Sequence, residues 1–208
     1  MIQTPCPSCG GNVDFKSRFS VFQVCPYCTS MLVRTDMNVE MVGKMAQLAA
    51  DMSPFQLGTT GRFEKRHFEI LGKQKLVYSE GNWNEWYLMF DDGREGWLGE
   101  AQGFLMVSFP VKNFMIPDLG TLSAGSMIEI HKESYHVEDI KSVTCEGGVG
   151  ELPVPGVKGR RSTSVDLVGP AKSFANIDYA GHGDRLYLGR YAEFEELQFS
   201  NLRELDGW

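Results

Sequence analysis

Alternation of apolar and polar residues dominates this chain from residue 58 onward and predicts a protein built mainly of β-strands. From 58 to 110, glycine and polar turn residues separate the alternating segments at short intervals, as in antiparallel strands joined by tight turns. Asp91-Asp92-Gly93, between two aromatic segments, is a strong hairpin signal. The pattern predicts a small barrel or a strongly bent sheet with strands at 61–64, 67–73, 75–78, 83–90, 95–99 and 104–109.

A second strand-rich segment extends from 120 to 204. Its expected strands are 127–131, 135–142, 164–168, 175–179, 184–188 and 195–199. Short patterns recur between the segments, with Phe63 and Phe68 matching Ile130 and Tyr135, so we interpret 58–110 and 120–204 as two related antiparallel β-units. The connection at 146–161 is rich in glycine and proline, which indicates a long loop that is mobile or functional.

Between residues 36 and 52 the apolar positions recur at the spacing of an α-helix, and a proline follows at position 54. We therefore expect an amphipathic helix that links the N-terminal segment to the β-units, over 36–57. A helix lying on a membrane surface is the alternative, but its polar face would be rich in lysine and arginine, and only Lys44 is basic. The apolar positions are Val39, Val42, Met45, Leu48, Ala49 and Met52.

Four cysteines near the N-terminus have the spacing of a structural zinc site. Cys6 and Cys9 form one C-x-x-C pair, Cys25 and Cys28 form another, and short alternating segments lie around them. This layout predicts a zinc ribbon over 1–35, in which the metal supplies stability that so short a segment cannot obtain from its core. Four protein ligands leave no open coordination position, so we expect one structural zinc ion; a redox dithiol pair and an iron-sulfur cluster are the alternatives.

Composition and charge narrow the class of protein. The 208 residues are 42% apolar and 23% charged, as in a folded soluble protein. The sequence has no apolar run of about 18 residues and no signal peptide, so we expect a cytoplasmic protein that is not integral to a membrane. The net charge of −7 argues against a dedicated nucleic-acid binder, although Lys16, Arg18 and Arg34 leave binding through the ribbon open.

The aromatic segment from Asn82 to Tyr87 is the candidate binding surface. Strand alternation places Trp83, Glu85 and Tyr87 on one face and Trp86 on the other. We expect Trp86 to belong to the core and favour the interpretation that Trp83 and Tyr87, on the opposite face, cover the second β-unit. The alternative is that this face forms an exposed aromatic patch, suited to a cationic or flat ligand or to a partner's side chain.

The sequence shows no arrangement typical of a catalytic centre, so we do not expect an enzyme. The four histidines lack metalloprotease spacing, and neither a serine nucleophile elbow nor a phosphate-binding glycine loop is present. Cys145 stands alone, as a buried small apolar residue usually does. The carboxylates of Asp91 and Asp92 are explained by turn chemistry.

The chain resembles bacterial proteins that carry the domain of unknown function 4178. The resemblance implies an N-terminal zinc ribbon, a helix and two β-units, and it implies no established activity. Such proteins are encoded near polyamine aminopropyltransferase-like enzymes and small membrane proteins, which implies an accessory role in envelope or stress physiology and leaves association with a membrane protein open. The matching segments are both cysteine motifs, 53–58, Gly61-Arg62, 82–86, 90–93, Trp97-Leu98 and 174–179.

These observations favour a non-catalytic zinc-binding adaptor or accessory protein that acts by binding an unidentified protein partner. A second hypothesis is a binder of a small cationic, polyamine-like ligand, or an enzyme, that uses the aromatic and acidic surface around Trp83, Glu85, Trp86 and Asp92. A cavity of about 300 Å³ or more, lined by these aromatic residues, would favour the ligand, whereas a flat exposed apolar patch would favour the adaptor.

Overall fold

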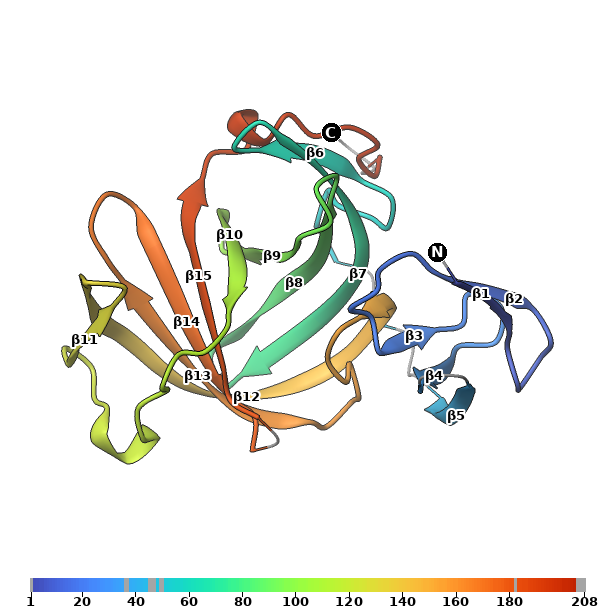
Figure 1. The fold of residues 1–208 in the computed structure, drawn as a ribbon, viewed down its shortest axis with the longest axis horizontal. Coiled ribbons are helices and arrows are strands. Elements are labelled where there is room, and N and C mark those ends of the chain that lie inside the picture. The colour runs from blue at the N-terminus through green and yellow to red at the C-terminus, as the bar shows by residue number, and fades with distance from the viewer. Residues whose placement is uncertain (1, 36–37, 45–47, 49–50, 182, 205–208) are drawn as a thin grey trace.

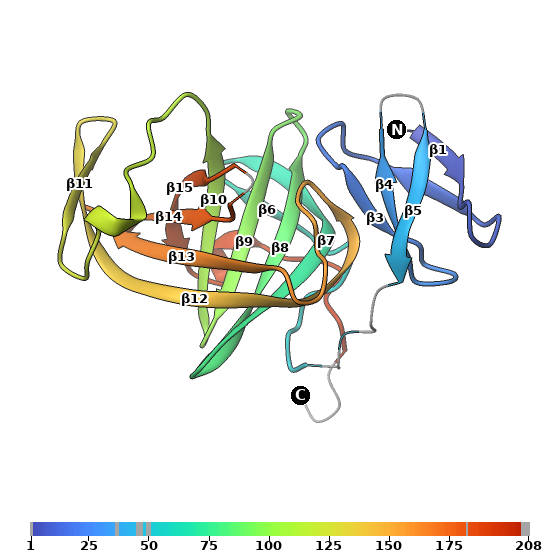
Figure 2. The ribbon, with the colours of Figure 1, turned by 90° about the horizontal axis from the view of Figure 1, so that it is seen from below.

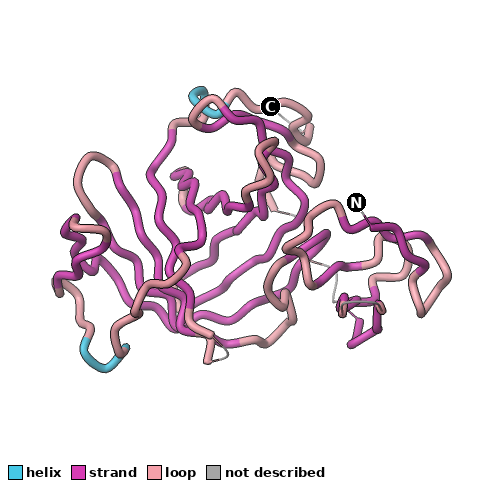
Figure 3. Tube along the Cα trace, viewed as in Figure 1, coloured by secondary structure: helices cyan, strands magenta, loops and turns pink. Residues whose placement is uncertain are grey.

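The computed structural model describes residues 2–35, 38–44, 48, 51–181 and 183–204. Strands make up most of this part of the chain (Figure 3), which confirms a mainly β protein. Its helices are two single turns of 3-10 helix, η1 (Leu119–Thr121) and η2 (Glu195–Leu197). The strand expected at 195–199 is therefore wrong, because Phe194 is helical and Gln198 adopts a left-handed backbone (φ 46°) that ends the turn.

Eight antiparallel strands close into a ring, which Figure 1 shows in face view. The ring closes through β12, whose residues up to Thr144 pair with β13 and whose residues from Thr144 to Gly150 pair with β7. The eight strands are β7 (Arg66–Tyr78), β8 (Gly81–Phe90), β9 (Glu95–Ala101), β10 (Phe104–Val111), β12 (Glu133–Leu152), β13 (Arg161–Val168), β14 (Ser173–Tyr179) and β15 (Arg185–Ala192).

The two predicted β-units contribute to one continuous sheet. β10 of the first pairs with β15 of the second, and β7 pairs with β12. Two shorter strands flank the ring: β6 (Thr60–Phe63) pairs with β7, and β11 (Met127–Ile130) pairs with β12. The Asp-Asp-Gly hairpin is confirmed between β8 and β9, where Gly93 has a φ of 81°. The division of the chain at 58–110 and 120–204 stays a prediction.

The cysteine-bearing segment lies beside the ring (Figures 1 and 2) and is joined to it by β-pairing. β1 (Ile2–Pro5) and β2 (Asn12–Phe15) form a hairpin, and β3 (Phe22–Val24) pairs with β4 (Ser30–Arg34). β3 also pairs with Glu151 and Leu152 at the end of β12. One strand thus runs from the ring into the sheet of the N-terminal segment, which we call the ribbon.

The predicted linking helix is wrong where the structure describes it. Val39–Lys44 form strand β5, which pairs with β4 at the edge of the ribbon sheet. The apolar positions of β5 fit the alternation of a strand as well as the spacing of a helix. Its valines favour a strand, and Gly43 is unfavourable in a helix. Six residues are too few to distinguish the period of a helix from that of a strand, and pairing with β4 stabilises the strand. Met45 and Ala49 of the predicted helix lie outside the described residues.

The glycine- and proline-rich segment is also more ordered than expected. Its first part, through Leu152, continues β12 and pairs with β7 and β3, because glycines here permit close approach of the neighbouring strand. Val154 is buried. The amide of Gly159 donates to the carbonyl of Cys145 at 2.8 Å, which folds the rest of the segment back on the ring. The expectation of a loop across 146–161 therefore holds only for the turn after Leu152.

The ring strands place apolar residues on the outer face and a mixture of polar and aromatic residues inside. On β13, Val165 and Leu167 belong to an outer apolar cluster, whereas Ser164 and Asp166 line a cavity within the ring. The outer apolar face is covered by segments that precede and follow the ring strands, including Phe55 and Leu197. Within the described ranges, no helix is long and apolar enough to span a membrane.

Candidate functional site

The four cysteines come together at two similar turns of the ribbon. Cys6 follows β1 and Cys25 follows β3; the carbonyl of Cys6 accepts from the amide of Gly10 at 2.8 Å, and that of Cys25 from Thr29 at 3.0 Å. Gly10 and Thr29 both have positive φ, the conformation that reverses the chain at such a turn. Each turn therefore brings its two cysteines to the same side of the backbone.

The four sulfur atoms lie within 4.8 Å of one another, so they could hold one metal ion. The Sγ atoms of Cys6 and Cys28 are 3.8 Å apart, and those of Cys9 and Cys25 are also 3.8 Å apart. These separations are far longer than the roughly 2.05 Å of a disulfide. The pKa values of two of these thiols move apart: hydrogen bonds with Ser30 lower that of Cys28 to about 6, whereas, despite a backbone hydrogen bond from Gly11, interaction with Cys28 raises that of Cys9 to about 12.

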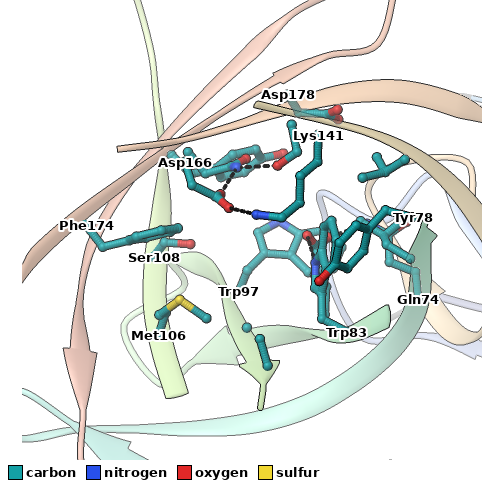
Figure 4. Close-up of a pocket in the computed structure, with 18 of the residues that line it drawn as sticks. Gln74, Tyr78, Trp83, Trp97, Met106, Ser108, Lys141, Asp166, Phe174 and Asp178 are labelled. Atoms are coloured by element: carbon teal, nitrogen blue, oxygen red, sulfur yellow. Dashed lines mark hydrogen bonds and ion pairs between the residues drawn. The ribbon is translucent and has the colours of Figure 1, made fainter. Parts of the chain in front are cut away.

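A second candidate site is the cavity inside the ring, which has a volume of about 230 Å³. Side chains from all eight ring strands line it, and Figure 4 shows them converging from opposite walls. Aromatic side chains form much of the wall: Tyr78, Trp83, Trp97, Phe104, Phe174, Tyr187 and Tyr191. Four carboxylates, of Glu85, Glu138, Asp166 and Asp178, face two cationic side chains, of Lys141 and Arg160, so the lining is acidic.

Glu85 lies in this cavity and is held by neutral donors. Its carboxylate accepts a hydrogen bond of 3.0 Å from the indole nitrogen of Trp83 and one of 2.6 Å from the amide nitrogen of Gln74. Burial raises the pKa of Glu85, because a carboxylate removed from water loses its solvation. The ion pairs of the described residues do not include Glu85.

Asp166, by contrast, has a cationic partner, which it shares with Asp139. The Lys141 ammonium lies 3.5 Å from the Asp166 carboxylate and 2.5 Å from the Asp139 carboxylate. The side-chain amide of Asn176 donates a hydrogen bond of 2.8 Å to Asp166. Figure 4 shows Lys141 reaching toward Asp166 between the aromatic side chains. Burial nevertheless raises the pKa of Asp166. Asp166 thus has an ion-pair partner, whereas Glu85 has none among the described residues, although the charge of Arg160 opposes the rise in the pKa of Glu85.

Arg160 anchors the Gln74 wall. Its guanidinium donates to the side-chain oxygen of Gln74 at 3.1 Å and to the carbonyl of Pro155 at 2.9 Å, and it lies 3.9 Å from Asp178. Gln74 is therefore oriented with its oxygen toward Arg160 and its nitrogen toward Glu85. The arrangement presents the Glu85 carboxylate to the cavity in a fixed position.

The structure divides the predicted aromatic surface between different environments. Trp83 and Glu85 line the cavity, and Trp86 is in the outer core as expected. Tyr87 is completely buried beneath the cavity, where it packs against Trp97, so the alternative of an exposed patch that includes Tyr87 is wrong. Asp92 lies in the exposed β8–β9 turn and bonds to Arg94. Because the ring is closed, the face of β8 that carries Trp83, Glu85 and Tyr87 points into the ring and not to solvent.

The basic residues of the ribbon are engaged with the protein itself. Lys16 pairs with Glu69 at 2.5 Å, Arg34 donates to the carbonyls of Ser17 and Arg18, and the guanidinium of Arg18 lies over the Phe19 ring. Nucleic-acid binding through these residues stays an untested alternative.

Sequence reasoning missed Lys141, Arg160, Asp166 and Asn176. A signal was present on β13 and β14, where polar residues alternate with the apolar residues of the outer core. The polar face of such a strand is usually expected to contact solvent. Only the closed ring shows that these polar side chains line the same cavity as those of β8.

Comparison with known proteins returned one family. The model described as "Domain of unknown function (DUF4178)" matches residues 56–194, which include all eight ring strands. Neither the curated proteins nor the solved structures gave a match.

Proposed function

The chain belongs to the DUF4178 family, and we propose that it binds a small organic cation inside the ring of strands, at the carboxylate of Glu85. The proposal is one of binding, without a catalytic step. It takes up the second hypothesis from the sequence, and the adaptor role is kept as a separate prediction.

The observation that carries the proposal is the state of Glu85. A buried carboxylate that accepts hydrogen bonds only from the neutral groups of Trp83 and Gln74 keeps an unfavourable desolvation energy. A ligand cation would supply the missing counter-charge. Lys141 does not supply it, because its ammonium is bound by Asp139 and Asp166, and Arg160, whose charge opposes the rise in the pKa of Glu85, forms its ion pair with Asp178.

The wall around Glu85 favours an organic cation over a metal ion. The Trp83 ring lies beside Tyr78, with centroids 5.8 Å apart, and Trp97 and Tyr187 also face the cavity. Aromatic faces attract an ammonium group by cation–π interaction and its hydrocarbon part by apolar contact. The volume of about 230 Å³ is smaller than the roughly 300 Å³ set out above as favouring a ligand, and it limits the ligand to a small molecule.

Calorimetric titration of the full chain with three molecules of similar size tests the charge requirement. We expect butylammonium to bind more tightly than butanol, and butyrate to bind least. Glu85→Gln should abolish the preference for butylammonium over butanol, whereas Glu80→Gln, a change at an exposed turn carboxylate, should keep it. Equal affinities for the three molecules in the wild-type chain would contradict the proposal.

We also propose that the four cysteines hold one structural zinc ion. Four sulfurs at the corners of a tetrahedron, each about 2.3 Å from zinc, lie about 3.8 Å from one another. The Cys6–Cys28 and Cys9–Cys25 sulfur separations of 3.8 Å agree with this geometry. Elemental analysis of the purified chain tests the identity of the metal.

The adaptor role predicted from the sequence rests on a different part of the chain. Exposed apolar side chains of the ribbon support it, namely Ile2, Tyr27, Met41 and Val42. Tyr27, at the second cysteine turn, is 68% exposed. Affinity capture with the wild-type chain and with Tyr27→Ser would test this role: loss of a captured protein in the variant supports a ribbon interface.

A further inference from the structure

The ribbon is clamped to the ring by one carboxylate. Glu151, on the last residues of β12, is 3% exposed, and its two oxygens accept hydrogen bonds from the backbone amides of Lys16 at 2.7 Å and Ser17 at 2.9 Å. These amides lie between β2 and β3, the strands that carry the two cysteine turns. A carboxylate bound by two amides fixes that backbone firmly to the ring.

A chain of hydroxyl groups continues from the clamp into the ring. The Ser17 hydroxyl lies 2.8 Å from the phenol oxygen of Tyr87, and the Tyr87 phenol donates to the Glu95 carboxylate at 3.0 Å. Tyr87 is completely buried and packs against Trp97, with ring centroids 5.4 Å apart. Ser17 therefore helps to position a side chain that lies directly behind the cavity wall.

An apolar contact runs in parallel with the polar one. Phe22 of β3 packs on a cluster formed by Leu71, Tyr87, Trp97, Leu152 and Val154, and Tyr187 packs on the same cluster. Trp97, Val154 and Tyr187 also line the cavity. One side chain of the ribbon thus packs on a cluster that includes residues of the cavity wall.

We infer that the metal-loaded ribbon forms the end support of the ring cavity, so that metal binding at the cysteines orders the cavity wall and raises its affinity for a ligand. Cys25 follows β3 directly, so a metal at the cysteines fixes the strand that carries Phe22. Without metal the small core of the ribbon is insufficient to hold this strand in place. The part about ligand affinity rests on the proposed function; the ordering of the wall does not.

Amide hydrogen exchange on the full chain tests the ordering without any ligand. Comparing zinc-loaded with chelated protein, we expect exchange to rise about tenfold or more in the ribbon and in β9 around Trp97. Exchange in β13 and β14, on the far side of the ring, should change by less than about twofold. A rise confined to the ribbon would overturn the inference.

A variant can remove the contacts of Glu151 and Ser17 between ribbon and ring while the cysteines keep the metal. It distinguishes loss of support for the cavity wall from general unfolding. In zinc-loaded Ser17→Ala/Glu151→Gln, with the zinc content confirmed by elemental analysis, β9 should exchange faster as it does after chelation. Glu40→Gln, at an exposed carboxylate on β5 of the ribbon, is the matched control and should behave as wild type. If chelation unfolds the whole chain, this variant decides: unchanged exchange in β9 overturns the inference and faster exchange supports it.

Butylammonium titration of the same samples provides the ligand readout. Chelation and the junction variant should each weaken its affinity about tenfold relative to zinc-loaded wild type. Absence of butylammonium binding to the wild type would contradict the proposed function alone, because the exchange experiment still decides whether the metal orders the wall. Equal affinity in all three samples would overturn the coupling.

Discussion

Gly72 of β7 lies so close to Glu151 that a Cβ atom on Gly72 would be 1.8 Å from the Glu151 carbonyl oxygen. The two residues meet where β12 leaves the ring and pairs with β3 of the ribbon. Only glycine permits this approach of two backbones. The position of Glu151, whose side chain binds the ribbon, therefore depends on glycine at position 72.

We predict that Gly72→Ala destabilises the chain by about 3 kcal/mol, because a backbone atom must move to admit the methyl group. Gly43→Ala on β5 is the matched control, since a Cβ there meets nothing within 4 Å. It should change the free energy of unfolding by less than about 0.5 kcal/mol. Urea denaturation measures both, and equal effects of the two changes would contradict the close approach.

The sequence was most informative where chemistry or period is local. The cysteine spacing predicted that the four sulfurs lie together, which is confirmed, and Asp91-Asp92-Gly93 forms the expected hairpin. Trp86 is in the core, as alternation required. The short segment at Val39–Lys44 failed, because its pattern fits both a helix and a strand and only the partner strand β4 decides between them.

The cavity could not be predicted because it depends on ring closure. Glu85 and Asp166 lie on strands that are far apart in sequence, and β12 brings those strands together by pairing with β7 at one end and β13 at the other. Alternation correctly separated Trp83 from Trp86. It could not tell whether the polar face of each strand meets solvent or the polar face of another strand.

The two tryptophans of β8 should differ in their contribution to stability. Trp86 is 3% exposed, packs edge-on against Phe55 with centroids 5.9 Å apart, and donates to Glu100. Trp86→Ala should cost about 3 to 5 kcal/mol. Trp83→Ala should cost about 1 to 2 kcal/mol, mainly the lost hydrogen bond to Glu85. Denaturant titration compares them, and equal costs would count against Trp83 as a cavity residue.

Loss of one cysteine ligand should unfold the ribbon. We expect the wild-type chain to contain about one zinc ion and Cys25→Ser to contain almost none, with a loss on the order of 10 kcal/mol of metal-binding free energy. Cys145→Ser is the matched control, because Cys145 is equally buried but lies on β12 outside the cluster, and it should keep the zinc. Iron in place of zinc, or metal retained by Cys25→Ser, would refute the zinc site.

The raised pKa of Glu85 should give stability and ligand affinity opposite dependences on pH. Burial keeps Glu85 protonated to a higher pH in the folded chain than in the unfolded chain, so the folded state binds more protons above the ordinary carboxyl pKa. The free energy of unfolding should therefore fall as the pH rises through the Glu85 pKa of the folded state. Asp166 shifts in the same direction and contributes a fall of its own.

Glu85→Gln stays neutral, so its unfolding free energy should fall less with pH than that of the wild type, and the difference isolates Glu85 from Asp166. Affinity for butylammonium should rise over the same pH range in the wild type, because the ammonium keeps its charge while Glu85 gains one. Denaturation and calorimetry in matched buffers measure the two trends. A wild-type affinity that does not change with pH would show that the cation binds elsewhere than at Glu85.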